Sequence, residues 1–333
     1  MTDVNQYLQE ILPAVVEAGK FGIGNAKFLS FVEDKNYEDQ PHFASKVYFG
    51  NVVMVTKNNG IKSQSVVVKV HTNAAPHDLE ALYAQFYNEL LFYSDVLPFL
   101  RANDTEEIID TGGPFQDILI FENLQTSGFR PASSRTFIDE AHFRLSLAGI
   151  ARFHSLTFVA KKQDPEGLKK IVATIMETSY SENSSKEKLR MGSLKKVVRE
   201  EFYHFKRIRS TDSDMPRSRR WDEFIKIYAD ELKSSLSDKN ISSPSLTDIS
   251  QDFQRRGFAG YVKCSFYLPM CLAGMSIEDP ELANGSKKDV MELILHKGGE
   301  EATELVSAIV RHMIDRNFDF DYIFNPNQEE SKI

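Results

Sequence analysis

The spacing of apolar residues changes near residue 125, and this change restricts the chain to few architectures. Before it, Lys46–Thr56 and Ile61–Val70 are rich in the β-branched and aromatic residues that favour strands. After it, long stretches repeat their apolar residues every three or four positions, which is typical of helices. A small sheet followed by helices is an α+β plan. We therefore expect two lobes, one over residues 1–124 and one over residues 125–325.

The first lobe is predicted to contain an antiparallel sheet and one helix. Lys57-Asn58-Asn59-Gly60 separates the two strands, and its Asn-Gly pair suits the positive φ angles of a tight hairpin turn. A further strand is expected over Asp117–Phe121, after a Gly-Gly-Pro break. Between hairpin and strand, a helix is predicted over residues 78–97. Its apolar stripe, with one gap, consists of Leu79, Leu82, Phe86, Tyr93 and Val96.

The second lobe is predicted to be helical. The clearest stripe lies within Asp139–Lys161 and includes Leu147, Ala151 and His154. Further helices are expected over residues 189–207, 221–236, 253–272 and 301–316. Ser-rich and charged connectors are expected at residues 179–185, 210–219 and 234–250.

Composition excludes several classes of function. The chain has 48 acidic and 40 basic residues and a formal net charge of −8, which disfavours binding to nucleic acid. Its two cysteines, Cys264 and Cys271, cannot form a disulfide framework and lack metal-ligand spacing, so we expect buried, reduced thiols. No apolar run approaches the roughly 20 residues that cross a bilayer. Met1–Gln6 lacks the pattern of a signal peptide. A cytoplasmic protein is expected.

Two charged residues occupy positions where apolar ones are expected. Lys69 interrupts Val66–Val70, which otherwise has the pattern of a buried strand. Glu89 fills the gap in the helical stripe, three residues after Phe86 and four before Tyr93. Since buried Lys and Glu are rare unless paired, an ion pair between strand and helix is one interpretation. The other is that Lys69 extends to a sheet edge while Glu89 lies at the border of the buried face.

Four segments, in order, resemble the ecdysteroid kinase-like family, which is related to choline kinases and aminoglycoside phosphotransferases. Each is weak alone, but their order is specific. The first segment, Phe86–Pro98, is a helix with Glu, Tyr and a final Leu-Pro. The second, Ile118–Arg130, is a hinge strand with the loop that follows it. The other two are a helix with Phe-His, Leu147–Leu156, and a C-terminal helix, Asp252–Pro269.

The resemblance implies a protein-kinase-like two-lobe fold, ATP and Mg²⁺ as cofactors, and a small-molecule acceptor. It assigns Lys69 to the ATP phosphates and Glu89 to the position of its partner. It places Ser45 in the loop that covers the phosphates. The hinge, whose backbone would meet adenine, would comprise Phe121, Glu122, Asn123 and Leu124.

The motifs for phosphoryl transfer are missing from this sequence. The family has a His-Gly-Asp loop with a following Asn, and an Asp-Phe-Gln metal motif. None of the eight histidines here precedes Gly-Asp. His312–Asn317 has only one residue between its Asp and Asn and is expected at a helix end. Asp252-Phe253-Gln254 spells the metal motif but precedes a helix rather than following a strand. No catalytic residue or metal ligand is therefore assigned.

The catalytic segment is expected to be absent at a junction near Phe205–Ser210. There the resemblance passes from the helices before the catalytic loop to a helix well after the metal motif. A skipped exon, a gene-model error and a true loss remain open as explanations of the junction.

The family phosphorylates a hydroxyl of a steroid-like or choline-like acceptor. We expect this chain to be inactive or severely impaired. The alternative is a non-catalytic pseudokinase or binding isoform. A third possibility is a non-functional transcript product. An apolar stripe left exposed on Asp139–Lys161 would offer a surface to a protein partner.

Overall fold

The computed structural model describes residues 4–24, 26–35, 45–71, 79–101, 118–132, 138–176, 217–275 and 287–318. The chain divides into two compact units. Unit 1 comprises Met1–Pro131 and Ala160–Ser179, and unit 2 comprises Ala132–Val159 and Tyr180–Ile333. Strands and helices are both present, so the predicted α+β class is confirmed. The predicted helix over residues 189–207 and the predicted junction near residues 205–210 lie outside the described residues.

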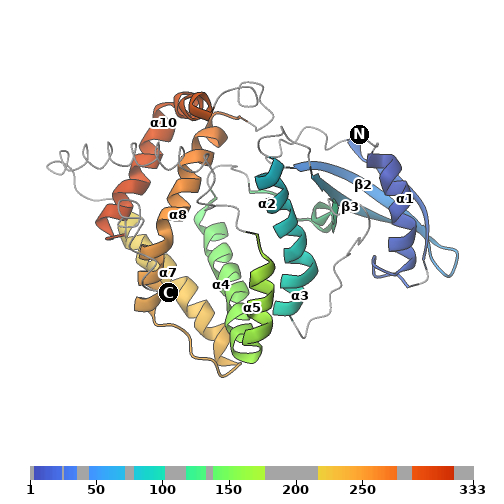
Figure 1. Ribbon diagram of the computed structural model, residues 1–333, viewed down its shortest axis with the longest axis horizontal. Coiled ribbons are helices and arrows are strands. Elements are labelled where there is room, and N and C mark those ends of the chain that lie inside the picture. The colour runs from blue at the N-terminus through green and yellow to red at the C-terminus, as the bar shows by residue number, and fades with distance from the viewer. Residues whose placement is uncertain are drawn as a thin grey trace. The chain divides into compact units, whose positions relative to one another are not determined.

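Unit 1 contains a four-stranded antiparallel sheet (Figure 1). Its strands follow one another in chain order. They are β1 (Lys27–Glu33), β2 (Ser45–Val55), β3 (Ile61–His71) and β4 (Ile118–Glu122). The predicted hairpin is formed by β2 and β3. Its turn differs from the prediction, because only Asn59 of the Asn-Gly pair has a positive φ, of 54°. Thr56 closes the loop by donating its N–H to the Gly60 carbonyl, at 2.9 Å.

One face of this sheet packs against helix α1 (Val4–Glu17), which the sequence analysis did not predict. The even-numbered residues of β2, β3 and β4 face this core, where Val66 and Val68 are buried. Since side chains alternate along a strand, the odd-numbered residues lie on the opposite face. The helix contributes Tyr7, Leu8, Leu12, Val15 and Val16 to the core.

The opposite face of the sheet carries the helix predicted over residues 78–97. It is present as α2 (Leu79–Leu91), a π-helical turn η2 (Phe92–Val96) and α3 (Leu97–Leu100). Pro98 has no N–H to donate to the carbonyl four residues earlier, so a regular α-helix cannot continue through this point. The ring of Tyr93 lies edge-on to Phe121 of β4, with centroids 5.0 Å apart.

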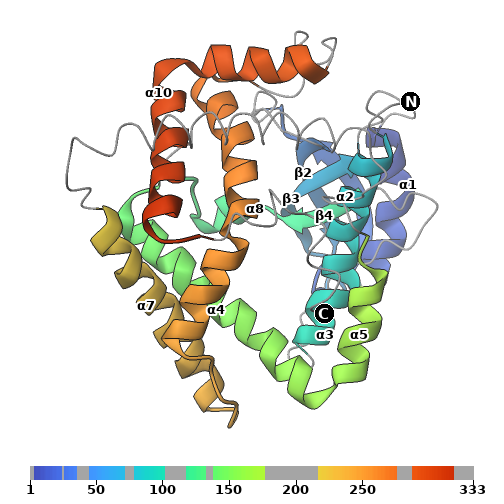
Figure 2. The same ribbon diagram turned by 60° about the vertical axis from the view of Figure 1, so that its left-hand side comes forward.

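Unit 2 is helical over its described residues. Helix α4 (Glu140–Gln163) contributes its residues up to Val159, and α7 (Arg217–Ser237), α8 (Leu246–Leu272) and α10 (Lys287–Asp315) follow. The helices α8 and α10 run side by side (Figures 1 and 2). Trp221 packs among Phe253, His312 and Phe318. No helix within the described ranges has the length and apolarity to span a membrane.

Three helices of unit 2 begin earlier than predicted, and α7 starts at Arg217 instead of residue 221. Helix α8 starts at Leu246 because Ser245 and Asp248 form a capping box. The predicted connector over residues 234–250 is therefore limited to residues 238–245. Helix α10 starts at Lys287 and bends sharply (Figure 2), since Gly299 has φ 66° and ψ −163°. Glycine tolerates this left-handed φ without steric cost.

The prediction of buried thiols was wrong. Cys264 and Cys271 are both free and exposed. They lie seven residues apart on α8 and therefore share one helical face. The buried side of α8 is formed instead by residues that include Phe258, Tyr261 and Met270.

Substitution of Gly50 by Ala is expected to destabilise unit 1. Gly50 faces the α1 core, and a Cβ there would overlap the ring of Phe31 and lie 2.9 Å from the Val32 carbonyl oxygen. Overpacking of this kind costs about 1–3 kcal/mol. Urea unfolding followed by circular dichroism should show the loss. Gly24→Ala is the matched control, because its Cβ would have no atom within 4 Å. Equal stability of the two variants would contradict this packing.

Candidate functional site

Lys69 lies on the face of the sheet opposite α1. Its neighbours Val66 and Val68 point into the α1 core, whereas Lys69 is partly exposed. The strand pattern expected around Lys69 is thus buried on one face and only partly buried on the other. Val66–Val70 is an alternating strand whose apolar outward residue, Val67, hides the alternation in the sequence.

Lys69 and Glu89 form an ion pair with two close contacts. Lys69 Nζ lies 2.7 Å from Glu89 Oε1 and 2.5 Å from Oε2. The pairing predicted from the sequence is thus present, between β3 and α2. The side chains are 27% and 31% exposed, so both charges keep part of their hydration. An ammonium group has three N–H donors, and two donated to Glu89 leave one for another acceptor.

Helix α2 is held in place beside the ion pair. Asn88 Nδ2 donates to the Met176 carbonyl at 2.7 Å, and Met176 N–H donates to Asn88 Oδ1 at 2.8 Å. Met176 follows helix α5 (Pro165–Thr174), which also belongs to unit 1. Burial and the negative charge of Glu89 raise the pKa of Tyr93. Asn88 of α2 and Tyr93 of η2, whose ring contacts Phe121, thus hold this helical segment on either side of Glu89.

The strand positions that flank Lys69 are apolar, and two of them, Phe49 and Leu119, are buried. In the register of the sheet, Lys69 lies between Val47 of β2 and Leu119 of β4. The neighbouring row on the same face is Phe49, Val67 and Phe121. A cation beside an apolar floor suits a ligand with a flat ring and an anionic group.

The predicted hinge residues lie at the edge of the sheet, where β4 ends. Asn123 N–H donates to the Ser65 carbonyl at 3.0 Å. The adjacent pair, Val66 and Glu122, is therefore a non-hydrogen-bonded pair, whose backbone groups point away from each other. Since β4 is the last strand in the sheet order, the backbone N–H and C=O of Glu122 face its outer edge. Leu124 is 52% exposed, whereas Phe121 is partly buried on the Lys69 face.

For Ser45, the structure gives the position and pairing of the backbone. It is the first residue of β2 and pairs with His71. It lies two residues before Val47, the cross-strand partner of Lys69. Phe43 and Ala44 lie outside the described residues, so the assignment of this loop to the phosphates stays a prediction.

The two partial catalytic motifs lie on helices. Asp252 is exposed on α8 and pairs with Arg256 at 2.9 Å, while Phe253 packs on Trp221. His312 packs on Trp221 near the end of α10. Across the described part of the chain, no three His, Cys, Asp or Glu side chains gather as metal ligands. No Mg²⁺ ligands are therefore assigned among the described residues.

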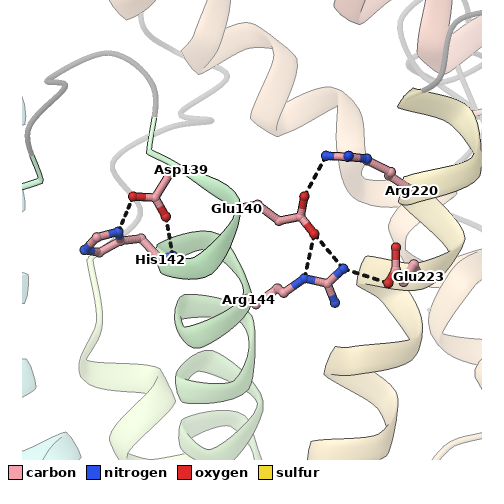
Figure 3. A network of polar contacts seen from close by, with 6 residues as sticks. All are labelled: Asp139, Glu140, His142, Arg144, Arg220 and Glu223. Atoms are coloured by element: carbon pink, nitrogen blue, oxygen red, sulfur yellow. Dashed lines mark hydrogen bonds and ion pairs between the residues drawn. The ribbon is translucent and has the colours of Figure 1, made fainter.

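A second polar cluster joins α4 to α7 in unit 2, and the sequence analysis did not predict it (Figure 3). Arg144 contacts Glu140 at 2.7 Å and Glu223 at 2.6 Å, and Arg220 contacts Glu140 at 2.6 Å. The hydrogen bond from Arg144, with the charges of Arg220 and Arg144, lowers the pKa of Glu140. Both arginines are thus engaged by carboxylates within the cluster. Its long-range pairs carry no recognisable sequence pattern, and its role is to connect the two helices.

His142 belongs to the same region (Figure 3). Its backbone N–H donates to Asp139 Oδ1 at 2.9 Å, and its ring Nδ1 lies 2.6 Å from Oδ2. These two hydrogen bonds, the backbone one first, lower the pKa of Asp139. Asp139 therefore caps the start of α4.

A family model described as the ecdysteroid kinase-like family matches residues 40–211, just over half of the chain. The matched range contains Lys69, Glu89, the hinge residues and Ser45. The fourth segment of the sequence resemblance, Asp252–Pro269, lies beyond it. No curated protein and no solved structure matches the chain.

The ion pair predicts a measurable coupling between Lys69 and Glu89. Lys69→Met, Glu89→Gln and the double variant form a cycle that isolates their interaction. Because both side chains are partly exposed, we expect a favourable coupling of only about 0.5–1 kcal/mol in urea unfolding at low salt. Added salt should weaken it. Strict additivity of the two substitutions would contradict the pairing.

Proposed function

Because the chain belongs to the ecdysteroid kinase-like family, we propose that it binds ATP through Lys69 and the outer edge of β4 without completing phosphoryl transfer. Membership implies a kinase-like fold and a small-molecule substrate. The activity class is therefore that of a small-molecule kinase-like protein. The proposal concerns which part of that activity this chain keeps.

The observation that carries the proposal is the bidentate pairing of Lys69 with Glu89. Kinases place such a pair beside the ATP phosphates, where the lysine donates to phosphate oxygens. Glu89 orients the ammonium group and leaves its third N–H for an anionic oxygen. The partial exposure of Lys69, at 27%, keeps this group accessible.

The base of the nucleotide has a matching surface nearby. Phe49, Val67 and Phe121 form an apolar row next to the Lys69 row. The backbone carbonyl of Glu122 is directed to the sheet edge, where it can accept a hydrogen bond from an amino group of the base. We propose the N–H of Leu124, two residues further on, as the corresponding donor. This pattern of one acceptor and one donor complements the edge of adenine.

The loss of transfer chemistry is inferred from the sequence. No histidine precedes Gly-Asp, so the chain lacks the aspartate that would accept the proton of the attacking hydroxyl. The family match ends at residue 211, next to the proposed junction at residues 205–210. The single Asp-Phe-Gln sequence lies within α8, where Asp252 pairs with Arg256. We propose that the chain acts in the cytoplasm as a non-catalytic, nucleotide-binding isoform.

A combined binding and turnover assay tests the proposal. Equilibrium dialysis of the full chain with labelled ATP should show binding that Lys69→Met reduces at least tenfold. The same protein, supplied with Mg²⁺ and a steroid or choline acceptor, should transfer no γ-phosphate above the level of Lys69→Met. Transfer that Lys69→Met abolishes would show that the chain is a working kinase. Absence of ATP binding would overturn the nucleotide site itself.

A further inference from the structure

Asn123, at the junction of β4 and the following turn, is a buried polar residue with many partners. Its side chain and backbone are together only 2% exposed. The side chain donates from Nδ2 to Ser65 Oγ at 3.1 Å and accepts at Oδ1 from Gln125 N–H at 3.1 Å. The backbone N–H donates to the Ser65 carbonyl at 3.0 Å. The backbone carbonyl accepts from Thr126 N–H and from its hydroxyl, at 3.1 and 2.7 Å.

These contacts exceed what the local helix cap requires. Asn123 caps the short 3₁₀ helix η3 (Leu124–Ser127), and the bond from Gln125 N–H alone serves that purpose. The two bonds to Ser65 instead join the turn to β3. Ser65 lies four residues before Lys69 on that strand. Asn123 thus fixes the turn relative to the strand that carries the ion pair.

The turn is also fixed at its far end. Phe129 N–H donates to the Leu124 carbonyl at 3.2 Å, and Gly128 permits this with a φ of 90°. Arg130 Nη1 donates to the Gln125 carbonyl at 2.6 Å. The backbone on both sides of Asn123 therefore has a defined course, which begins at Glu122.

We infer that the contact between Asn123 and Ser65 is a positioning element that sets the adenine edge of the site at a fixed spacing from Lys69. It holds the Glu122 carbonyl and the Leu124 N–H in place for the amino group and a ring nitrogen of adenine. Asn123 itself is buried and acts through these contacts, without touching the ligand. The inference rests on the proposed function, and it adds that base and phosphate are recognised by separable parts of the chain.

The test compares ATP with inorganic tripolyphosphate, which retains the phosphates but lacks the base. Calorimetry on the full chain should show that Asn123→Ala weakens ATP binding about tenfold, the equivalent of about 1.4 kcal/mol. Tripolyphosphate affinity should stay unchanged, because Lys69 is untouched. Lys69→Met should weaken both ligands. Ser127→Ala, an exposed hydroxyl in the same turn, is the matched control and should change neither.

Each remaining outcome decides the inference. An equal loss of ATP and tripolyphosphate affinity in Asn123→Ala would show a merely structural role and overturn it. Unchanged ATP affinity would overturn it as well, while leaving nucleotide binding intact. If the wild-type chain binds no ATP, the proposed function fails first. Should Asn123→Ala not fold, Ser65→Ala removes one of the two contacts and should weaken ATP alone, about threefold. Equal effects on both ligands would again overturn the inference.

Discussion

The ion pair between Lys69 and Glu89 is the constraint on which the proposed site depends. It connects β3 to α2 across the face of the sheet that α1 leaves free. Both side chains keep part of their hydration, so the pair adds little to stability and acts mainly by orienting the Lys69 ammonium group. Asn88 and Tyr93 hold α2 at the position this pairing requires. The result is a cation beside an apolar floor, at a fixed distance from the edge of β4.

The residues alone offered this pair as one of two interpretations, and the family resemblance assigned it. A lysine within a valine-rich strand and a glutamate within an apolar helical stripe both need an explanation. The hairpin and the long helices were predictable, since each has its own periodicity. Their ends were less predictable. The start of α8 depends on the capping box of Ser245 and Asp248, and α10 consists of two helical segments that meet at a kink at Gly299.

Other features depend on contacts between distant residues. Helix α1 has apolar residues at Leu8, Leu12 and Val15, a usable helical signal that its polar first residues and Pro13 weaken. Asn123 appears in the sequence only as part of a hinge, and its role emerges from Ser65, 58 residues away. The cysteines of α8 were misplaced because apolar neighbours do not determine which helical face is covered. The absence of the catalytic segment does not depend on contacts of this kind. It was inferred only from the absence of the His-Gly-Asp motif in the sequence.

Thermal unfolding of the full chain with and without ATP tests the central claim most directly. A ligand that binds only the folded protein at a hundredfold excess over its Kd stabilises it by about 2.7 kcal/mol. We expect ATP to raise the unfolding temperature of the wild-type chain clearly more than that of Lys69→Met. An equal rise in both proteins would show that ATP binds elsewhere. A wild-type transition that ATP does not move, at any concentration, would contradict the claim that this ion pair organises a nucleotide site.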